Sequence, residues 1–138
     1  MRYFYCAKAE YVNEISQKGI SSDENTIPII IVDERFLMYQ FVIDSYAFEI
    51  LETDEFCFFE ISAEAITGNI VDMQTDNLFA PFFKLLKQPN IEKQFLSPQI
   101  TDRYDSMGFD IGVFLVENKQ NFNEAYKRKI LEYAKESQ

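Results

Sequence analysis

The segment FCFFEIS, residues 56–62, is the most strand-like stretch of this chain and decides how the rest is interpreted. Successive side chains of a strand point to opposite faces, so the segment divides into two rows. The rows are Cys57, Phe59 and Ile61 on one face and Phe56, Phe58 and Glu60 on the other. Both rows are largely apolar. This pattern is typical of a strand at the centre of a sheet that is covered on each side.

Other segments also have the composition of strands. RYFYCA (2–7) is short and aromatic, and IPIIIV (27–32) is rich in β-branched residues. Because Pro28 has no amide hydrogen to donate, it belongs at the start of its strand or at a sheet edge. IEKQFLSPQI (91–100) is expected to be extended, and FDIGVFLVE (109–117) to form a late strand.

Helical patterns separate these strands. A first helix over about residues 8–18 would end at Gly19, a favourable C-terminal residue. Asp33 would cap a second, largely apolar helix over 34–48, and a final amphipathic helix is expected over 121–137. A further helix could begin at Thr75 or Asp76 and run to about Gln88, although Pro81 should break or restart it.

Together these elements predict a single α+β domain over residues 1–138. We expect a mixed or antiparallel sheet of about five or six strands and three or four helices. The chain is 47% apolar and long enough to bury a full core without disulfides or metals. No apolar run reaches the roughly 18 residues of a membrane span, and the N-terminus lacks the pattern of a signal peptide. We therefore expect a cytoplasmic protein that does not associate with membranes.

Histidine is absent from the sequence, which excludes histidine bases, histidine zinc sites and histidine-activated nucleophiles. Cys6 and Cys57 have no metal-ligand spacing, and buried thiols are the simplest interpretation. Lys8, two residues after Cys6, is the only local group that could activate that thiol. Glu60 and Glu64 could do acid–base work if they met in one cleft. The sequence favours a protein that is not an enzyme and implies neither a cofactor nor a metal site.

The net charge of −10 is concentrated in one part of the chain. Residues 10–83 contain 15 acidic residues but only Lys18 and Arg35 as bases. Such a region repels nucleic acid and speeds encounter with a basic protein. Solubility alone is a competing explanation for the same charge.

We therefore expect a small acidic binding protein, of the immunity type or another inhibitor type, which neutralises a basic protein partner. Nucleases and transferases that act on nucleic acids have basic active-site surfaces, which an acidic face could block. Aromatic side chains would supply the dehydrated centre of the interface. The residues expected to bind the partner are Asp44, Tyr46, Phe48, Glu49, Glu52, Asp54 and Glu55. The segment LFAPFF (78–83) could add an exposed apolar patch, or could pack against the sheet.

FYCAK (4–8) ends an aromatic strand, and ISQKGI (15–20) ends the helix that follows it at a glycine. This order of elements resembles the first strand and helix of the ADP-ribosyltransferase and RNA 2′-phosphotransferase superfamily. FLSPQI is similar to a late, proline-containing segment of such domains. The resemblance implies an alternative function, in which a cleft lined by Tyr5, Cys6 and Lys8 binds NAD or a related nucleotide.

The chain also departs from that family. Cys6 stands where the family has a histidine or arginine, and a thiol cannot supply the two directed hydrogen bonds of an imidazole. The family's glutamate has no certain counterpart, since Gln99 is the nearest polar residue in its segment. If the fold is shared, the resemblance implies a catalytic set that has decayed or been replaced.

Overall fold

The computed structural model describes residues 1–34, 39–77 and 79–99 of the chain. Farther along it describes only Glu117, Asn121, Glu124, Ala125, Arg128, Leu131, Glu132 and Lys135. The chain forms two compact units, residues 1–101 and 102–138. In the second unit the described residues of the expected final helix are helical, apart from Asn121. The late strand expected over 109–117 falls outside the described residues, except for Glu117, which is helical. The single-domain organisation of 1–138 stays a prediction.

The first unit is built on an antiparallel sheet in the order β5-β6-β3-β1-β4-β8. Its strands are β1 (Arg2–Lys8), β3 (Ile27–Val32), β4 (Phe56–Ile61), β5 (Asn69–Asp72), β6 (Phe83–Lys87) and β8 (Leu96–Gln99). A separate two-stranded ladder joins β2 (Ile20–Ser21) to β7 (Asn90–Ile91). The α+β fold class and an antiparallel sheet are thereby confirmed, and β4 is an internal strand as predicted.

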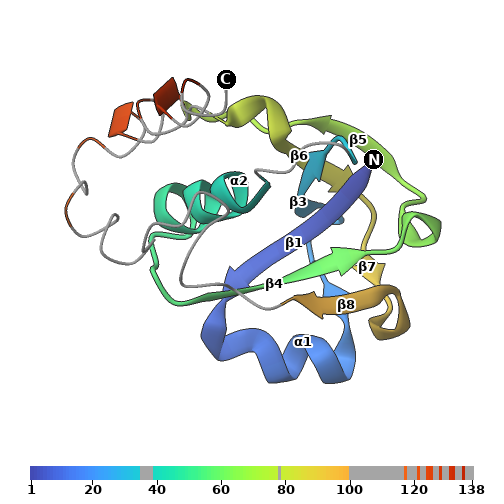
Figure 1. The fold of residues 1–138 in the computed structure, drawn as a ribbon. Helices are drawn as coiled ribbons and strands as arrows, with labels where there is room; N and C mark the ends of the chain where they lie inside the picture. The colour runs from blue at the N-terminus through green and yellow to red at the C-terminus, as the bar shows by residue number, and fades with distance from the viewer. Residues whose placement is uncertain are drawn as a thin grey trace. The chain divides into compact units, whose positions relative to one another are not determined.

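Two α-helices lie on opposite faces of this sheet, α1 (Val12–Lys18) and α2 (Tyr39–Ser45) (Figure 1). A π-helical turn, η2 (Tyr46–Ile50), continues α2. Short 3₁₀ turns complete the unit: η1 (Ala9–Tyr11), η3 (Ala63–Ala65), η4 (Ala80–Phe82) and η5 (Lys93–Phe95). The two α-helices of the described part of this unit are fewer than the three or four expected.

The alternation of β1 divides the core into two layers. Phe4 faces α2, where its ring stacks on Tyr39 at 5.3 Å and meets Phe58 edge-on at 5.9 Å. Ala7 faces α1 and packs in a cluster with Ile15. The same cluster contains Ile27, Ile29, Cys57, Phe59, Ile61, Leu86 and Ile91. Because both faces of the sheet bury large apolar side chains, β1 and β4 are apolar on both sides.

The region between residues 73 and 88 differs from the expected helix. After η4 the chain runs as strand β6, which pairs with β3 from Ile27↔Leu86 to Ile30↔Phe83. Pairing with a distant strand outweighs the local helical pattern here. Phe79 and Phe83, two aromatic residues of the segment expected to form an apolar patch, are buried in the core. Pro28 lies near the start of β3, before the pairing with β1 begins at Ile30, so its missing amide hydrogen removes no bond to β1.

Gln88 holds the end of β6 to the loop that precedes β5. Its side-chain carbonyl accepts from the backbone amides of Thr67 and Gly68 at 2.9 and 3.0 Å, and from the Thr67 hydroxyl at 3.2 Å. Its amide nitrogen donates to the carbonyls of Ala65 and Asn90 at 2.9 and 2.8 Å. This buried side chain therefore satisfies polar groups of two backbone segments, residues 65–68 and Asn90.

Candidate functional site

Residues 49–55, called here the acidic turn, comprise the end of η2 and the loop that leads to β4, in a conformation fixed by hydrogen bonds. The Leu51 amide donates to the Tyr46 carbonyl at 3.2 Å, and the Thr53 amide donates to the Ala47 carbonyl at 3.0 Å. The Thr53 hydroxyl both donates to the Glu55 carbonyl and accepts from the Glu55 amide, each at 3.1 Å. Glu52 has a positive φ of 55°, which lets the chain reverse. The turn therefore presents its side chains from a defined backbone.

The acidic turn carries exposed carboxylates at Glu49, Glu52, Asp54 and Glu55. Among the described residues the ion pairs are Met1–Glu34, Arg2–Glu60 and Lys84–Asp72, and none of them involves this turn. Partial burial raises the pKa of Glu49 above its ordinary value. Lys8, opposite Phe56 in the β1–β4 pairing, is the nearby base, and it forms no ion pair with the turn. Negative charges crowded on one turn and left without an ion pair favour an incoming cation.

Two residues expected to bind the partner lie in the core instead. Asp44 is 0% exposed and accepts a hydrogen bond from Gln40 Nε2 at 2.9 Å. Tyr46 is 3% exposed, and its ring meets Phe83 edge-on at 5.2 Å. Neither can reach a partner, because α2 and η2 form one continuous helical segment that turns both side chains toward the sheet. Phe48 is half-buried, so the expected surface reduces to the four carboxylates of the acidic turn.

The acidic turn has a neighbour that the sequence analysis missed. The Ala9 amide donates to the Glu55 carbonyl at 3.0 Å, which joins η1 to the start of β4. Glu10, the next residue, is exposed, and Tyr11 is 46% exposed. An exposed aromatic ring therefore lies near the carboxylates, although not the one that was expected. Only the pairing of β1 with β4 brings these segments together, so no local pattern could have found them.

The alternative cleft of Tyr5, Cys6 and Lys8 is not formed. Along β1, Tyr5 packs on the α1 side, and alternation turns Cys6 to the opposite side. Cys6 is 4% exposed. Burial, with smaller contributions from Cys57 and Asp44, raises the pKa of Cys6 well above its ordinary value, so the group stays a thiol. Lys8 is exposed at the end of the strand. Because successive side chains of a strand alternate, the sequence could have predicted that Tyr5 and Cys6 face opposite sides of the sheet.

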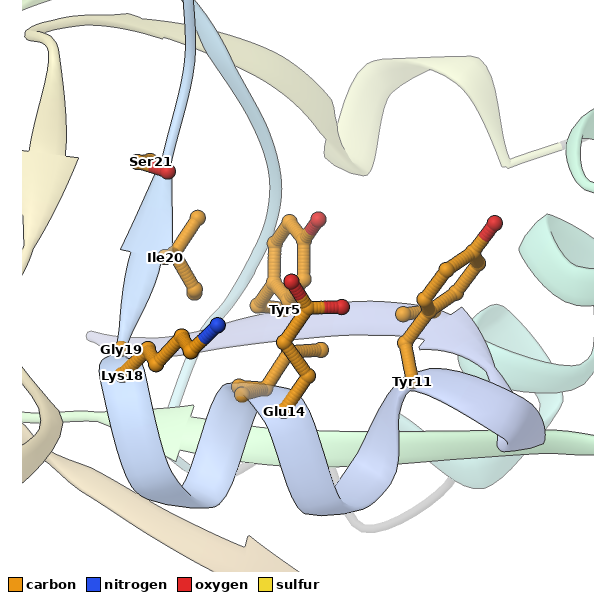
Figure 2. Close-up of a pocket in the computed structure, with 9 residues that line it drawn as sticks. Tyr5, Tyr11, Glu14, Lys18, Gly19, Ile20 and Ser21 are labelled. Atoms are coloured by element: carbon orange, nitrogen blue, oxygen red, sulfur yellow. The ribbon is translucent and has the colours of Figure 1, made fainter.

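One opening on the α1 side, called here the α1 pocket, is a cavity of about 260 Å³ (Figure 2). Tyr5 of β1, Tyr11 of η1, and Glu14 and Lys18 of α1 project into it, and Ile20 and Ser21 of β2 close one end. The expected helix end at Gly19 is confirmed, since its amide donates to the Ile15 carbonyl at 2.8 Å and its φ is +76°. A Cβ at Gly19 would lie 2.4 Å from the Ile91 carbonyl oxygen, so only glycine fits between α1 and the β2–β7 ladder.

Glu60 is held by Arg2 and is not a free acid. Arg2 Nε and Nη2 donate to the two carboxylate oxygens at 3.1 and 3.0 Å. The guanidinium also lies 4.6 Å from the centre of the Tyr39 ring and 5.0 Å from that of Phe4. This bidentate and stacked geometry orders the end of β1. It gives Glu60 a structural partner rather than an acid–base role with Glu64.

In the described part of the chain, no three histidine, cysteine, aspartate or glutamate side chains are grouped so that they could hold a metal ion. No helix in the same residues has both the length and the apolar character needed to cross a bilayer. Comparisons of the chain with protein-family models, with curated proteins and with solved structures gave no match.

Proposed function

We propose that this chain is a small acidic binding protein, of the immunity or inhibitor type, which docks a basic protein partner on the acidic turn. One observation carries the proposal: Glu49, Glu52, Asp54 and Glu55 are exposed on one hydrogen-bonded turn, without an ion pair among the described residues. A fixed backbone lowers the entropic cost of presenting these carboxylates to a partner. The excess of acids in residues 10–83 adds a long-range field that steers a basic surface toward the turn.

Two observations support a role that is not catalytic. The Cys6 thiol is buried with a raised pKa, so it is a poor nucleophile. Glu60, the acid near the end of β4, forms an ion pair with Arg2. The protein would therefore act by covering a basic surface, with electrostatic complementarity setting the association rate.

The test is the binding of a capped octapeptide of alternating arginine and serine, followed by calorimetry at low and at moderate salt. The test variant combines Glu49→Gln, Glu52→Gln, Asp54→Asn and Glu55→Gln. The control variant neutralises the same types of exposed residue elsewhere, at Asp23, Glu24, Glu64 and Glu92. We expect the test variant to lose about tenfold or more in affinity and most of its salt dependence. Equal losses in both variants would mean that net charge alone attracts the peptide, and would overturn the proposal.

The NAD-binding alternative is tested separately by titrating the unmodified protein with NAD. Because Tyr5, Cys6 and Lys8 do not line one cleft, we expect no heat of binding. Saturable binding that Tyr5→Ala abolishes would favour the alternative over an acidic binding protein.

A further inference from the structure

The α1 pocket places two tyrosine rings around an acidic group. Tyr5 comes from β1 and Tyr11 from η1, and Figure 2 shows both side chains and that of Glu14 pointing into the same opening. Neither tyrosine stacks on another aromatic ring in the part of the chain that the structure describes. Tyr11 is 46% exposed, and Tyr5, although it packs against the core cluster, borders the same cavity, so both rings can contact a group that enters it.

Tyr5 offers a neutral ring. Burial raises the pKa of Tyr5 above its ordinary value, so this phenol keeps its proton at neutral pH. Neutral aromatic rings attract cations through the negative potential over their faces. A cavity of about 260 Å³ has room for the end of an arginine side chain.

The charge around the pocket favours a cation as well. Glu14 is exposed and belongs to none of the ion pairs of the described residues, although Lys18 follows it by one helical turn. Glu10 precedes Tyr11, and the hydrogen bond from the Ala9 amide to the Glu55 carbonyl brings the acidic turn close to this edge of the pocket. Lys18 is the one basic side chain in the lining.

We propose that the α1 pocket receives an arginine side chain of the basic partner. This inference rests on the proposed function and names the anchoring contact within it. The guanidinium lies between the rings of Tyr5 and Tyr11 and donates to the Glu14 carboxylate. Arginine fits better than lysine because its planar cation stacks on aromatic faces and donates to a carboxylate through two parallel bonds. The acidic turn steers the partner, and the pocket fixes its position.

Lys18 makes the proposal testable through the direction in which its removal changes the affinity. A cation that enters the pocket is repelled by Lys18 and attracted by Glu14. Removing the charge of Lys18 should therefore strengthen binding, and removing that of Glu14 should weaken it. An anionic ligand would give the opposite signs, and a zwitterion would lose affinity in both variants.

The experiment measures the affinity of the arginine–serine octapeptide, and of the same peptide with lysine for arginine, by calorimetry at low salt. The variants are Glu14→Gln, Tyr11→Leu and Lys18→Gln. Their matched controls are the exposed residues Glu64→Gln and Lys87→Gln, which lie outside the pocket lining. We expect Glu14→Gln and Tyr11→Leu to weaken the arginine peptide by about threefold each, and Lys18→Gln to strengthen it by about twofold. The lysine peptide should bind more weakly and respond less to Tyr11→Leu.

A second readout locates the binding. Ile15 and Ile20 line the pocket, whereas Ile43 lies in α2. We expect the arginine peptide to shift the methyl NMR signals of Ile15 and Ile20 and to leave that of Ile43 unchanged.

The outcomes separate the two proposals. If Glu14→Gln matches Glu64→Gln and Tyr11→Leu leaves the affinity unchanged, while the fourfold acidic-turn variant still weakens the peptide, the pocket inference fails and the proposed function stands. Reversed signs for Glu14→Gln and Lys18→Gln also overturn the inference. If the acidic-turn variant matches its own control, the proposed function fails whatever the pocket does.

Discussion

On the face of the sheet that α2 covers, three polar or reactive side chains are buried, whereas on the α1 face a tyrosine and a glutamate border an open cavity. Asp44, Cys6 and Tyr46 lie on the sealed side with 0%, 4% and 3% exposure. On the other side Tyr11 is 46% exposed, and Glu14 reaches the same pocket. The difference teaches that residue type did not reveal accessibility here. Three of the side chains that the sequence suggested for binding or chemistry are buried in the core. Tyr11 and Glu14, from the helical segment after β1, are accessible instead.

The strongest test of this contrast compares neighbouring residues of β1. Phe4→Ala should lower the free energy of unfolding by about 3–5 kcal/mol, because it removes a fully buried ring between Tyr39 and Phe58. Tyr5→Ala should cost only about 1–2 kcal/mol, because Tyr5 borders the pocket. Urea unfolding of both variants measures the difference. Equal costs would mean that the α1 face is packed as tightly as the α2 face.

Gln88 extends the comparison, because it is a buried polar side chain on the α1 side. Ala65, whose carbonyl it binds, belongs to the core cluster under α1. Gln88→Met keeps the volume but leaves the Thr67 and Gly68 amides without their acceptor, so it should cost roughly 2–4 kcal/mol. Gln94→Met, at an exposed position, is the control. A similar stability for both variants in urea unfolding would show that water replaces these bonds easily.

The sealed side should also be more sensitive to alkali. Burial raises the pKa of Cys6 and of Tyr46, so the unfolded chain releases these protons at lower pH than the folded protein does. Their stabilising effect is complete below the unfolded cysteine pKa of about 8.5 and falls as the pH rises beyond it. Cys6→Ala should flatten the alkaline fall in unfolding free energy more than Cys57→Ala. Backbone hydrogen bonds partly oppose the rise in the pKa of Cys57, which is the reason for the difference. If the unfolding free energy of the two variants fell equally with rising pH, the larger effect expected for Cys6 would be contradicted.

The smallest expected effect lies on the acidic turn. Partial burial raises the pKa of Glu49, so its charge opposes folding at neutral pH and does so less near pH 4. Glu49→Gln should therefore stabilise the fold by less than about 0.5 kcal/mol at pH 7, and this gain should shrink near pH 4. Glu52→Gln serves as the control in thermal unfolding at both pH values. A gain that persists unchanged at pH 4 would point to a cause other than charge.

Part of this structure could be predicted from the sequence. The ends of β1, β3 and β4 lie within one residue of the predicted segments, because apolar runs of β-branched and aromatic residues end at polar turns. Gly19 marked the end of α1 for a local reason, its positive φ. FKLLK, in contrast, has no local signal that distinguishes a strand from a helix, and only pairing with β3 decides it.

The candidate site was less predictable, because it depends on which way the side chains of α2 and η2 face relative to the sheet. The burial of Asp44 and Tyr46 follows from how α2 continues into η2 and packs on the sheet, which no spacing rule gives. The acidic turn was predicted because exposure of clustered carboxylates is the rule. The position of Tyr11 near this turn could be found only from the pairing of β1 with β4.

The central place of β1 also has a consequence for synthesis of the chain. Its two neighbours are β3 and β4, and the last residue of β4 is Ile61. At a translation rate of about 5–20 residues per second, roughly 3–10 s pass between synthesis of β1 and completion of β4. During that interval β1, an aromatic strand with two apolar faces, cannot yet pair with the complete β4. The nascent chain should therefore be a better substrate for chaperones than the finished protein is.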